Sequence, residues 1–158
     1  MIALLHRFAL DLFGRLPRPA RRLVVRTIAP SYTVGAVCLV ERDDGAVVLL
    51  QQRYRSRWGL PGGLLARGEP AHEAVLREVR EEIGLVIELD GAPTVVVDER
   101  VRRVDVVYRG RPTNGDSPQP TSPEIVAVDW FGTDDLPDLQ EETVAALEAL
   151  GKLGPARG

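Results

Sequence analysis

Apolar residues change their spacing along the chain, and the changes mark out helical and strand-like segments. Between Ile2 and Leu16 an apolar residue recurs every three or four positions, until Pro17 interrupts the pattern. This spacing predicts an amphipathic helix, and a second short helix is predicted over residues 20–28. Residues 1–30 are therefore expected to form an N-terminal helical arm.

After the arm, the apolar positions take the spacing of β-strands. Runs of β-branched and apolar residues predict strands at residues 33–41, 46–53, 86–89, 94–99, 103–109 and 125–131. An Asp-Gly pair between the first two predicts a hairpin. Helices are predicted at 70–83, opened by Pro70 and ended by Gly84, and at 139–150. Strands interleaved with helices indicate an α/β fold with a mixed β-sheet.

The segments between and after these elements complete the expected organisation. Residues 110–123 are rich in Pro, Gly, Ser and Thr and predict a long mobile loop. Residues 151–158 follow the last predicted helix and are expected to be a flexible C-terminal tail. The chain has 158 residues, which favours one main domain, and we place it at residues 31–150.

Three carboxylates fall on one short arc of the helix predicted at 70–83. Glu78, Glu81 and Glu82 are three, four and one positions apart, so they are neighbours on the helix surface. Like charges at such spacings disfavour a helix by roughly 0.2 to 0.5 kcal/mol per pair. A hard divalent cation bound by carboxylates and by the phosphates of a substrate would compensate for this cost. The arc therefore indicates a metal site that handles a diphosphate.

The sequence around this arc resembles a known motif. Residues 63–85 read G-x5-E-x7-R-E-V-x-E-E-x-G-L and match every fixed position of the Nudix box, so the chain resembles the Nudix hydrolase superfamily. The flanks agree, because residues 58–63 resemble the usual lead into the box and residues 129–131 the closing strand. The resemblance covers residues 31–150. It implies a Nudix-type α/β/α sandwich, with the arm as an addition, and a pyrophosphohydrolase activity.

The resemblance also implies a metal and the groups that hold it. Mg²⁺ is the expected cofactor, with Mn²⁺ as an alternative. Its expected ligands are Glu78, Glu81, Glu82 and the backbone carbonyl near Gly63. Bound Mg²⁺ would neutralise charge that develops on the diphosphate and lower the pKa of its water.

Other residues of the box and its surroundings are expected to support this chemistry. Arg77 is assigned to the catalytic set because it is expected to bridge Glu69 and the helix, which would hold the carboxylates in place. The general base is left open: it is a box glutamate, Glu81 or Glu82, or Glu124 at the end of the predicted loop.

The substrate side of the site is predicted from residues that precede the box. Arg53 and Arg55 are candidates to bind phosphate oxygens, although a solvated role is equally open for each. Trp58 is a candidate to stack on a base, and packing in the core is its alternative.

These assignments predict a Mg²⁺-dependent hydrolase that cleaves the diphosphate linkage of a nucleoside diphosphate joined to another moiety, such as a nucleoside triphosphate or nucleotide derivative. The alternatives are a hydrolase of a non-nucleoside diphosphate, such as a prenyl ester, and an inactive Nudix-fold regulator that binds nucleotides. The resemblance does not name the substrate. The proline typical of ADP-ribose hydrolases would fall near Val101, and the tyrosine typical of dinucleoside-polyphosphate hydrolases near Arg102 or Arg103; neither is present.

Charge and cysteine content limit the partners and the compartment. Residues 1–32 carry six Arg against one Asp, whereas the remainder is acidic and brings the net charge to −3. An acidic body favours metal capture and disfavours nucleic acid. We expect a small-molecule diphosphate as the partner and a cytoplasmic protein. The arm is expected to pack on its own domain or in a homodimer; a membrane-surface helix is the less favoured alternative. Cys38 is the only cysteine, which excludes an intramolecular disulfide.

Overall fold

The computed structural model describes residues 2–113, 115 and 117–153, and it divides into two compact units, residues 1–32 and 33–158. The first unit contains helices α1 (Ile2–Arg15) and α2 (Arg18–Ile28), close to the two helices that the apolar spacing predicts. Pro19 lies in the first turn of α2, where its missing N–H costs no hydrogen bond. In the described part of the chain, no helix is long and apolar enough to cross a membrane.

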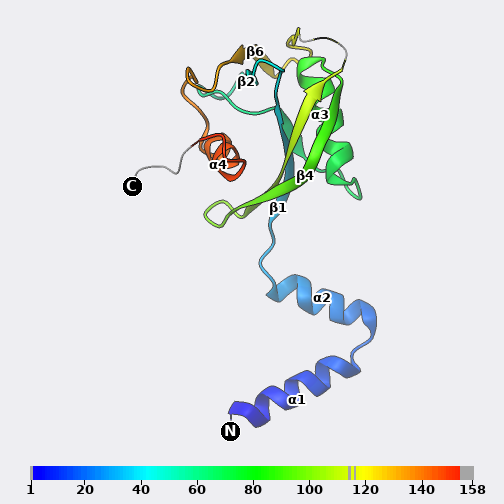
Figure 1. The fold of residues 1–158 in the computed structure, drawn as a ribbon. Coiled ribbons are helices and arrows are strands. Elements are labelled where there is room, and N and C mark those ends of the chain that lie inside the picture. Colours follow the sequence, from blue (N-terminus) through cyan, green and yellow to red (C-terminus); the bar gives the residue numbers. More distant parts are fainter. Residues whose placement is uncertain (1, 114, 116, 154–158) are drawn as a thin grey trace. The chain divides into compact units, whose positions relative to one another are not determined.

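The second unit is a mixed sheet with a helix on each face, which confirms the predicted α/β class (Figure 1). Four strands pair in the order β3 (Gly62–Leu64), β1 (Thr33–Val40), β5 (Arg103–Pro112) and β4 (Ile87–Asp98). β1 runs parallel to β5, and the other two pairs are antiparallel. Strands β2 (Val47–Gln52) and β6 (Ile125–Phe131) form a separate antiparallel pair.

Alternate side chains of β1 enter two different cores, because successive residues of a strand face opposite sides of the sheet. Cys38 and Val40 pack in the core under helix α3 (Ala71–Ile83). Leu39 packs in the core under helix α4 (Glu141–Ala149). Burial raises the pKa of the Cys38 thiol well above its usual range, so Cys38 acts as a small apolar residue.

Two strands differ from the pattern read in the sequence. β3 lies in a stretch where no strand was predicted, since three residues with two glycines carry no strand periodicity. β4 is a single strand where two were predicted, with its register shifted between Asp90 and Thr94. Gly91, at φ 71°, provides the bend at this irregularity.

The predicted mobile loop and flexible tail are both bonded to the domain where they are described. The Gln119 amide donates to the Ile83 carbonyl and the Thr121 amide to the Glu82 carbonyl, so the loop closes over the end of α3. In the tail, Lys152 pairs with Glu41, and its amide donates to Leu147. Residues 114, 116 and 154–158 lie outside the described residues.

Candidate active site

The rotation of α3 decides which glutamates reach the interior. Val75, Val79 and Ile83 are fully buried against the sheet, as their four-residue spacing predicts. Glu78 and Glu82 each precede one of these residues and line a pocket of about 500 Å³. Glu81 lies outside this pocket lining, with 60% of its side chain exposed.

Glu82 is a buried carboxylate held by the backbone that leads into β3. Its Oε2 accepts a hydrogen bond from the Gly62 amide at 2.8 Å. Burial, together with the negative charges of Glu78 and Glu124, raises the pKa of Glu82 to about 7, although hydrogen bonds from Gly62 and Gln52 act in the opposite direction. Three carboxylates thus face one another closely enough to repel, and a cation in the pocket would relieve that repulsion.

The two glycines of β3 allow the helix carboxylates to approach the backbone. A Cβ on Gly63 would lie 2.5 Å from Oε1 of Glu78, a distance that real contacts do not reach. Gly62 has a φ of 147°, and a Cβ there would lie 2.3 Å from the Ala36 carbonyl oxygen. Glycine at position 63 therefore lets the Glu78 carboxylate lie against β3, and glycine at position 62 lets β3 approach the backbone of β1.

Arg77 joins the loop before α3 to the carboxylates on it. Its Nε and Nη2 donate to the two carboxylate oxygens of Glu69, at 2.8 and 3.0 Å. Its Nη1 donates to Glu78 at 2.8 Å and to Glu81 at 3.2 Å. Glu69 also accepts from the Ala66 amide. Arg77 and Glu69 thus lie where the motif predicts them, with Arg77 between Glu69 and the helix carboxylates.

The expected metal ligands are near one another but are engaged with other partners. Within the described residues, no three Asp, Glu, His or Cys side chains are close enough as they stand to hold one ion. Arg77 pairs with Glu78 and Glu81, and Glu82 faces the Gly62 amide. The carboxylate and carbonyl donors nevertheless fit a hard cation such as Mg²⁺ or Mn²⁺, which takes oxygen ligands.

The remaining predicted residues separate into two groups. Glu124 and Arg55 line the pocket together with Glu78 and Glu82. Arg53 pairs with the neighbouring backbone, because its amide donates to the Glu124 carbonyl and its Nε to the Pro123 carbonyl. Neither Arg53 nor Trp58 lines this pocket.

The ring of Trp58 is engaged in packing. It meets Phe131 edge to face with 4.9 Å between ring centroids, beside the core under α4. This contact favours the packing alternative for Trp58 over stacking on a substrate.

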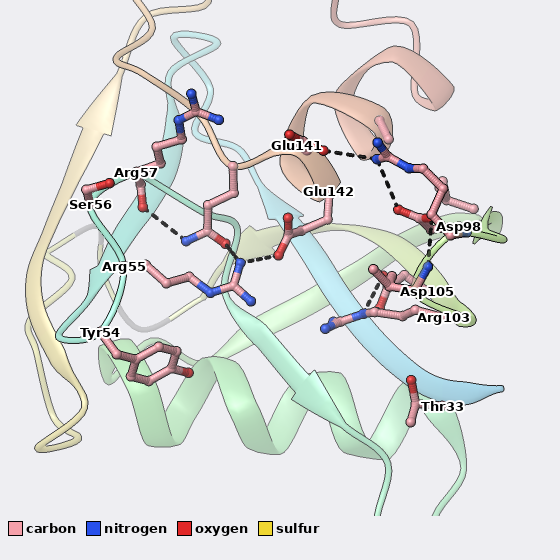
Figure 2. A pocket seen from close by; sticks show the side chains of 15 residues that line it. Thr33, Tyr54, Arg55, Ser56, Arg57, Asp98, Arg103, Asp105, Glu141 and Glu142 are labelled. Atoms are coloured by element: carbon pink, nitrogen blue, oxygen red, sulfur yellow. Dashed lines mark hydrogen bonds and ion pairs between the residues drawn. The ribbon is translucent and has the colours of Figure 1, made fainter.

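A second pocket, of about 1040 Å³, adjoins the first (Figure 2). The two pockets share six lining residues: Tyr54, Arg55, Arg103, Asp105, Gln140 and Glu142. Of these, only Arg55 was predicted from the sequence to belong to the site. Asp105 was detectable as the one acid inside an apolar strand run. The roles of Gln140 and Glu142 depend on contacts more than 80 residues away in sequence, which local patterns do not reveal.

Comparisons with known proteins agree with this geometry. The family model for the NUDIX domain matches residues 31–150. A MutT-like protein of Streptomyces ambofaciens is 33% identical over 131 residues, which cover 82% of this chain and 84% of that protein. An ADP-ribose pyrophosphatase of Mycobacterium tuberculosis is 37% identical over 97 residues, or 53% of this chain and 45% of that protein.

Among solved structures, a MutT NUDIX hydrolase from Burkholderia pseudomallei superposes with a TM-score of 0.65 at 32% identity, covering 77% of this chain and 99% of that one. The residues that the family model matches include the sheet strands, the box helix and the lining of the smaller pocket. The chain therefore belongs to the NUDIX family and has the domain of a Nudix pyrophosphohydrolase.

Proposed function

We propose that this chain is a Mg²⁺-dependent hydrolase that cleaves the diphosphate linkage of a nucleoside diphosphate joined to another moiety, with Mn²⁺ as a substitute metal. The observation that carries the proposal is the convergence of Glu78, Glu82 and Glu124 on one pocket beside the Gly62–Gly63 backbone. A bound divalent ion would neutralise phosphate charge and activate water there.

The residues of the chain have separate tasks in this proposal. Glu78, Glu82, Glu81 and the carbonyl of Gly63 would hold the metal, and Arg77, itself held by Glu69, would orient the helix carboxylates. The exposure of Glu81 and its bond to Arg77 make it the weaker candidate for general base. Glu82 and Glu124 lie in the pocket and are the stronger candidates.

The pocket walls and the relatives bear on the substrate. One relative is named an ADP-ribose pyrophosphatase, which supports a nucleotide derivative as the substrate class. The larger pocket is lined mainly by charged and polar side chains, with Val96, Val101 and Ala145 as its aliphatic members. A prenyl chain would find few aliphatic side chains to pack against there, so the prenyl alternative is disfavoured.

The test is product release from a panel of nucleoside triphosphates, nucleotide sugars, ADP-ribose and a prenyl diphosphate, each with Mg²⁺, with Mn²⁺ and with EDTA. We expect cleavage of at least one nucleotide with either metal and none with EDTA. Glu82→Gln protein, purified in the same way, controls for contaminating hydrolases. Absence of cleavage across the panel with both metals would reject the hydrolase and favour the nucleotide-binding regulator.

A further inference from the structure

Two arginines line the boundary between the smaller and the larger pocket. Arg55 follows β2, and Arg103 begins β5; both belong to the lining of each pocket. In Figure 2 their guanidinium groups point toward the same space from opposite sides. A substrate that reaches from the carboxylates of α3 into the larger pocket would therefore come close to both.

Each of these arginines is fixed by one edge only. Arg55 donates through Nη1 to Oε1 of Gln140, at 3.0 Å, and to Glu142. Arg103 donates through Nε to both oxygens of Asp105, at 2.9 and 2.8 Å. Within the described part of the chain these are the only nitrogens of either guanidinium group with a hydrogen-bond partner. An arginine has five N–H donors, so each group keeps donors for a ligand.

The partners of the two arginines are themselves held in place. Gln140 is buried, and its Nε2 donates to the Arg57 carbonyl, so its Oε1 is directed at Arg55. The side chain of Asp105 is only 11% exposed. Donors that are already fixed lose little conformational entropy when a ligand arrives.

Glu142 links the two arginines electrostatically. Burial would raise the pKa of Glu142, but its own amide, the hydrogen bond from Arg55 and the positive charges of Arg55 and Arg103 together lower it. Glu142 therefore stays ionised and lies within the field of both cations. Its charge partly neutralises them and competes with any other anion at this boundary.

We propose that Arg55 and Arg103 form an arginine pair that binds a phosphate group of the substrate, with Gln140, Glu142 and Asp105 as its positioning residues. The inference rests on the proposed function in one respect: when the substrate is a diphosphate, the group bound by the arginine pair is the phosphate farther from the carboxylates of α3. The free edges of two guanidinium groups suit the oxygens of a phosphate, which accept paired hydrogen bonds. The larger pocket then receives the group esterified to that phosphate.

The test uses isothermal titration of the full chain with methylenediphosphonate, whose P–C–P bridge is not hydrolysed, in EDTA and in Mg²⁺. Arg55→Gln should weaken binding by about tenfold, the loss of one charge-assisted contact. The double variant Arg103→Gln, Asp105→Asn should weaken it similarly, since removing both partners avoids an unpaired buried charge. Arg111→Gln, which breaks an exposed pair with Asp43 outside both pockets, is the matched control.

Glu142→Gln separates a ligand-binding pair from a purely structural one. The amide keeps an oxygen that can accept from Arg55 but removes the competing negative charge, so binding should tighten by about threefold. A structural pair would show weaker binding for Glu142→Gln and Arg55→Gln alike, and this result would overturn the proposal. Thermal unfolding verifies each fold, and Arg55→Lys replaces Arg55→Gln if the latter does not fold.

Hydrolysis measurements distinguish failure of this inference from failure of the proposed function. If the parent cleaves a nucleotide and Arg55→Gln cleaves it with an unchanged KM, phosphate binding by the arginine pair is contradicted, whereas the proposed hydrolase activity is supported. If no nucleotide is cleaved, the hydrolase is wrong, and the titration still decides the arginine pair. A parent chain that does not bind methylenediphosphonate in either buffer would also overturn the arginine pair.

Discussion

Glu82 combines burial, a backbone hydrogen bond and two negatively charged neighbours. Its side chain lies between α3 and β3, where the Gly62 amide fixes it. The sequence identified it by its spacing from Glu78, since both precede buried residues of one helix face. The hydrogen bond from the Gly62 amide was beyond prediction, because Gly62 reaches Glu82 only through the fold.

Replacing Glu82 with Gln should lower kcat by at least about 100-fold, since about 2.7 kcal/mol of metal-stabilised charge would be lost. Glu81→Gln should also lower kcat, by more than about tenfold. Glu69→Gln, which acts through Arg77, should have a smaller effect than Glu82→Gln. Steady-state kinetics on a cleaved nucleotide checks the order; a Glu69 variant more impaired than the Glu82 variant would reverse the assigned roles.

Glu69 should also contribute to stability in a pH-dependent way. Hydrogen bonds from Arg77, followed by the one from the Ala66 amide, lower its pKa from 4.5 to about 2. A carboxylate whose pKa is lower in the folded than in the unfolded chain stabilises the fold at pH values above its unfolded-state pKa. That contribution is lost as the pH falls toward 2. The difference in unfolding free energy between the parent and Glu69→Gln should therefore be largest above about pH 5.

Urea unfolding between pH 7 and pH 3 measures this difference. Glu88→Gln, at an exposed position of β4, controls for the loss of a carboxylate as such. If the difference in unfolding free energy between the parent and Glu69→Gln stayed constant from pH 7 to pH 3, the lowered pKa of Glu69 would not be its cause.

At the level of elements, β3 places the site although it is only three residues long. Its pairing with β1 brings the Gly62–Gly63 backbone beside the carboxylates of α3. Helix α3 was predictable because apolar spacing, Pro70 and Gly84 all indicate the same bounds. The part of the site formed by α4 and the loop after β2 was not predictable. It depends on contacts such as that of Arg55 with Glu142, which are 87 residues apart in sequence.

Gly62→Ala should be far more destabilising than an alanine at another glycine of positive φ. The new Cβ would clash with backbone atoms of β1, and together with strain this should cost about 3 kcal/mol or more. Gly45→Ala is the matched control: φ is 85° and nothing lies within 4 Å of the added Cβ, so strain of about 1 kcal/mol remains. Equal midpoints for the two variants in thermal unfolding would contradict the role of Gly62.

For the whole molecule, charge separates the two units. The arm carries the basic excess, and the domain carries the acidic one. The apolar faces of α1 and α2 need a partner, and we expect protein to supply it, either the domain itself or a second copy of the chain. Sequence spacing predicted both helices but says nothing about their partner, since an amphipathic pattern fits any apolar surface.

If the arm packs on protein, removal of residues 1–32 should cause aggregation or a change of oligomeric state, because its partner surface would lose its cover. Light scattering during gel filtration of the full chain and of residues 33–158 measures this change. Sedimentation with anionic vesicles at low and high salt tests the membrane alternative, for which binding would weaken as salt screens the arginines. We expect no such binding; clear vesicle binding and a well-behaved truncation would contradict our expectation.

The parallel pairing of β1 with β5 has a consequence for the order of folding. Thr33 pairs with Arg103, so 70 residues of chain must be closed into a loop before this ladder forms, whereas β4 and β5 are joined by a short turn. Loop-closure entropy therefore favours early formation of the β4–β5 hairpin and late docking of β1. β3 pairs with β1 across a shorter stretch of chain, Val37 with Gly62, so the glycines beside the carboxylates can join β1 before β1 docks on β5. Pulsed hydrogen exchange would reveal this order as later protection of the β1 amides that bond to β5 than of those that bond to β3.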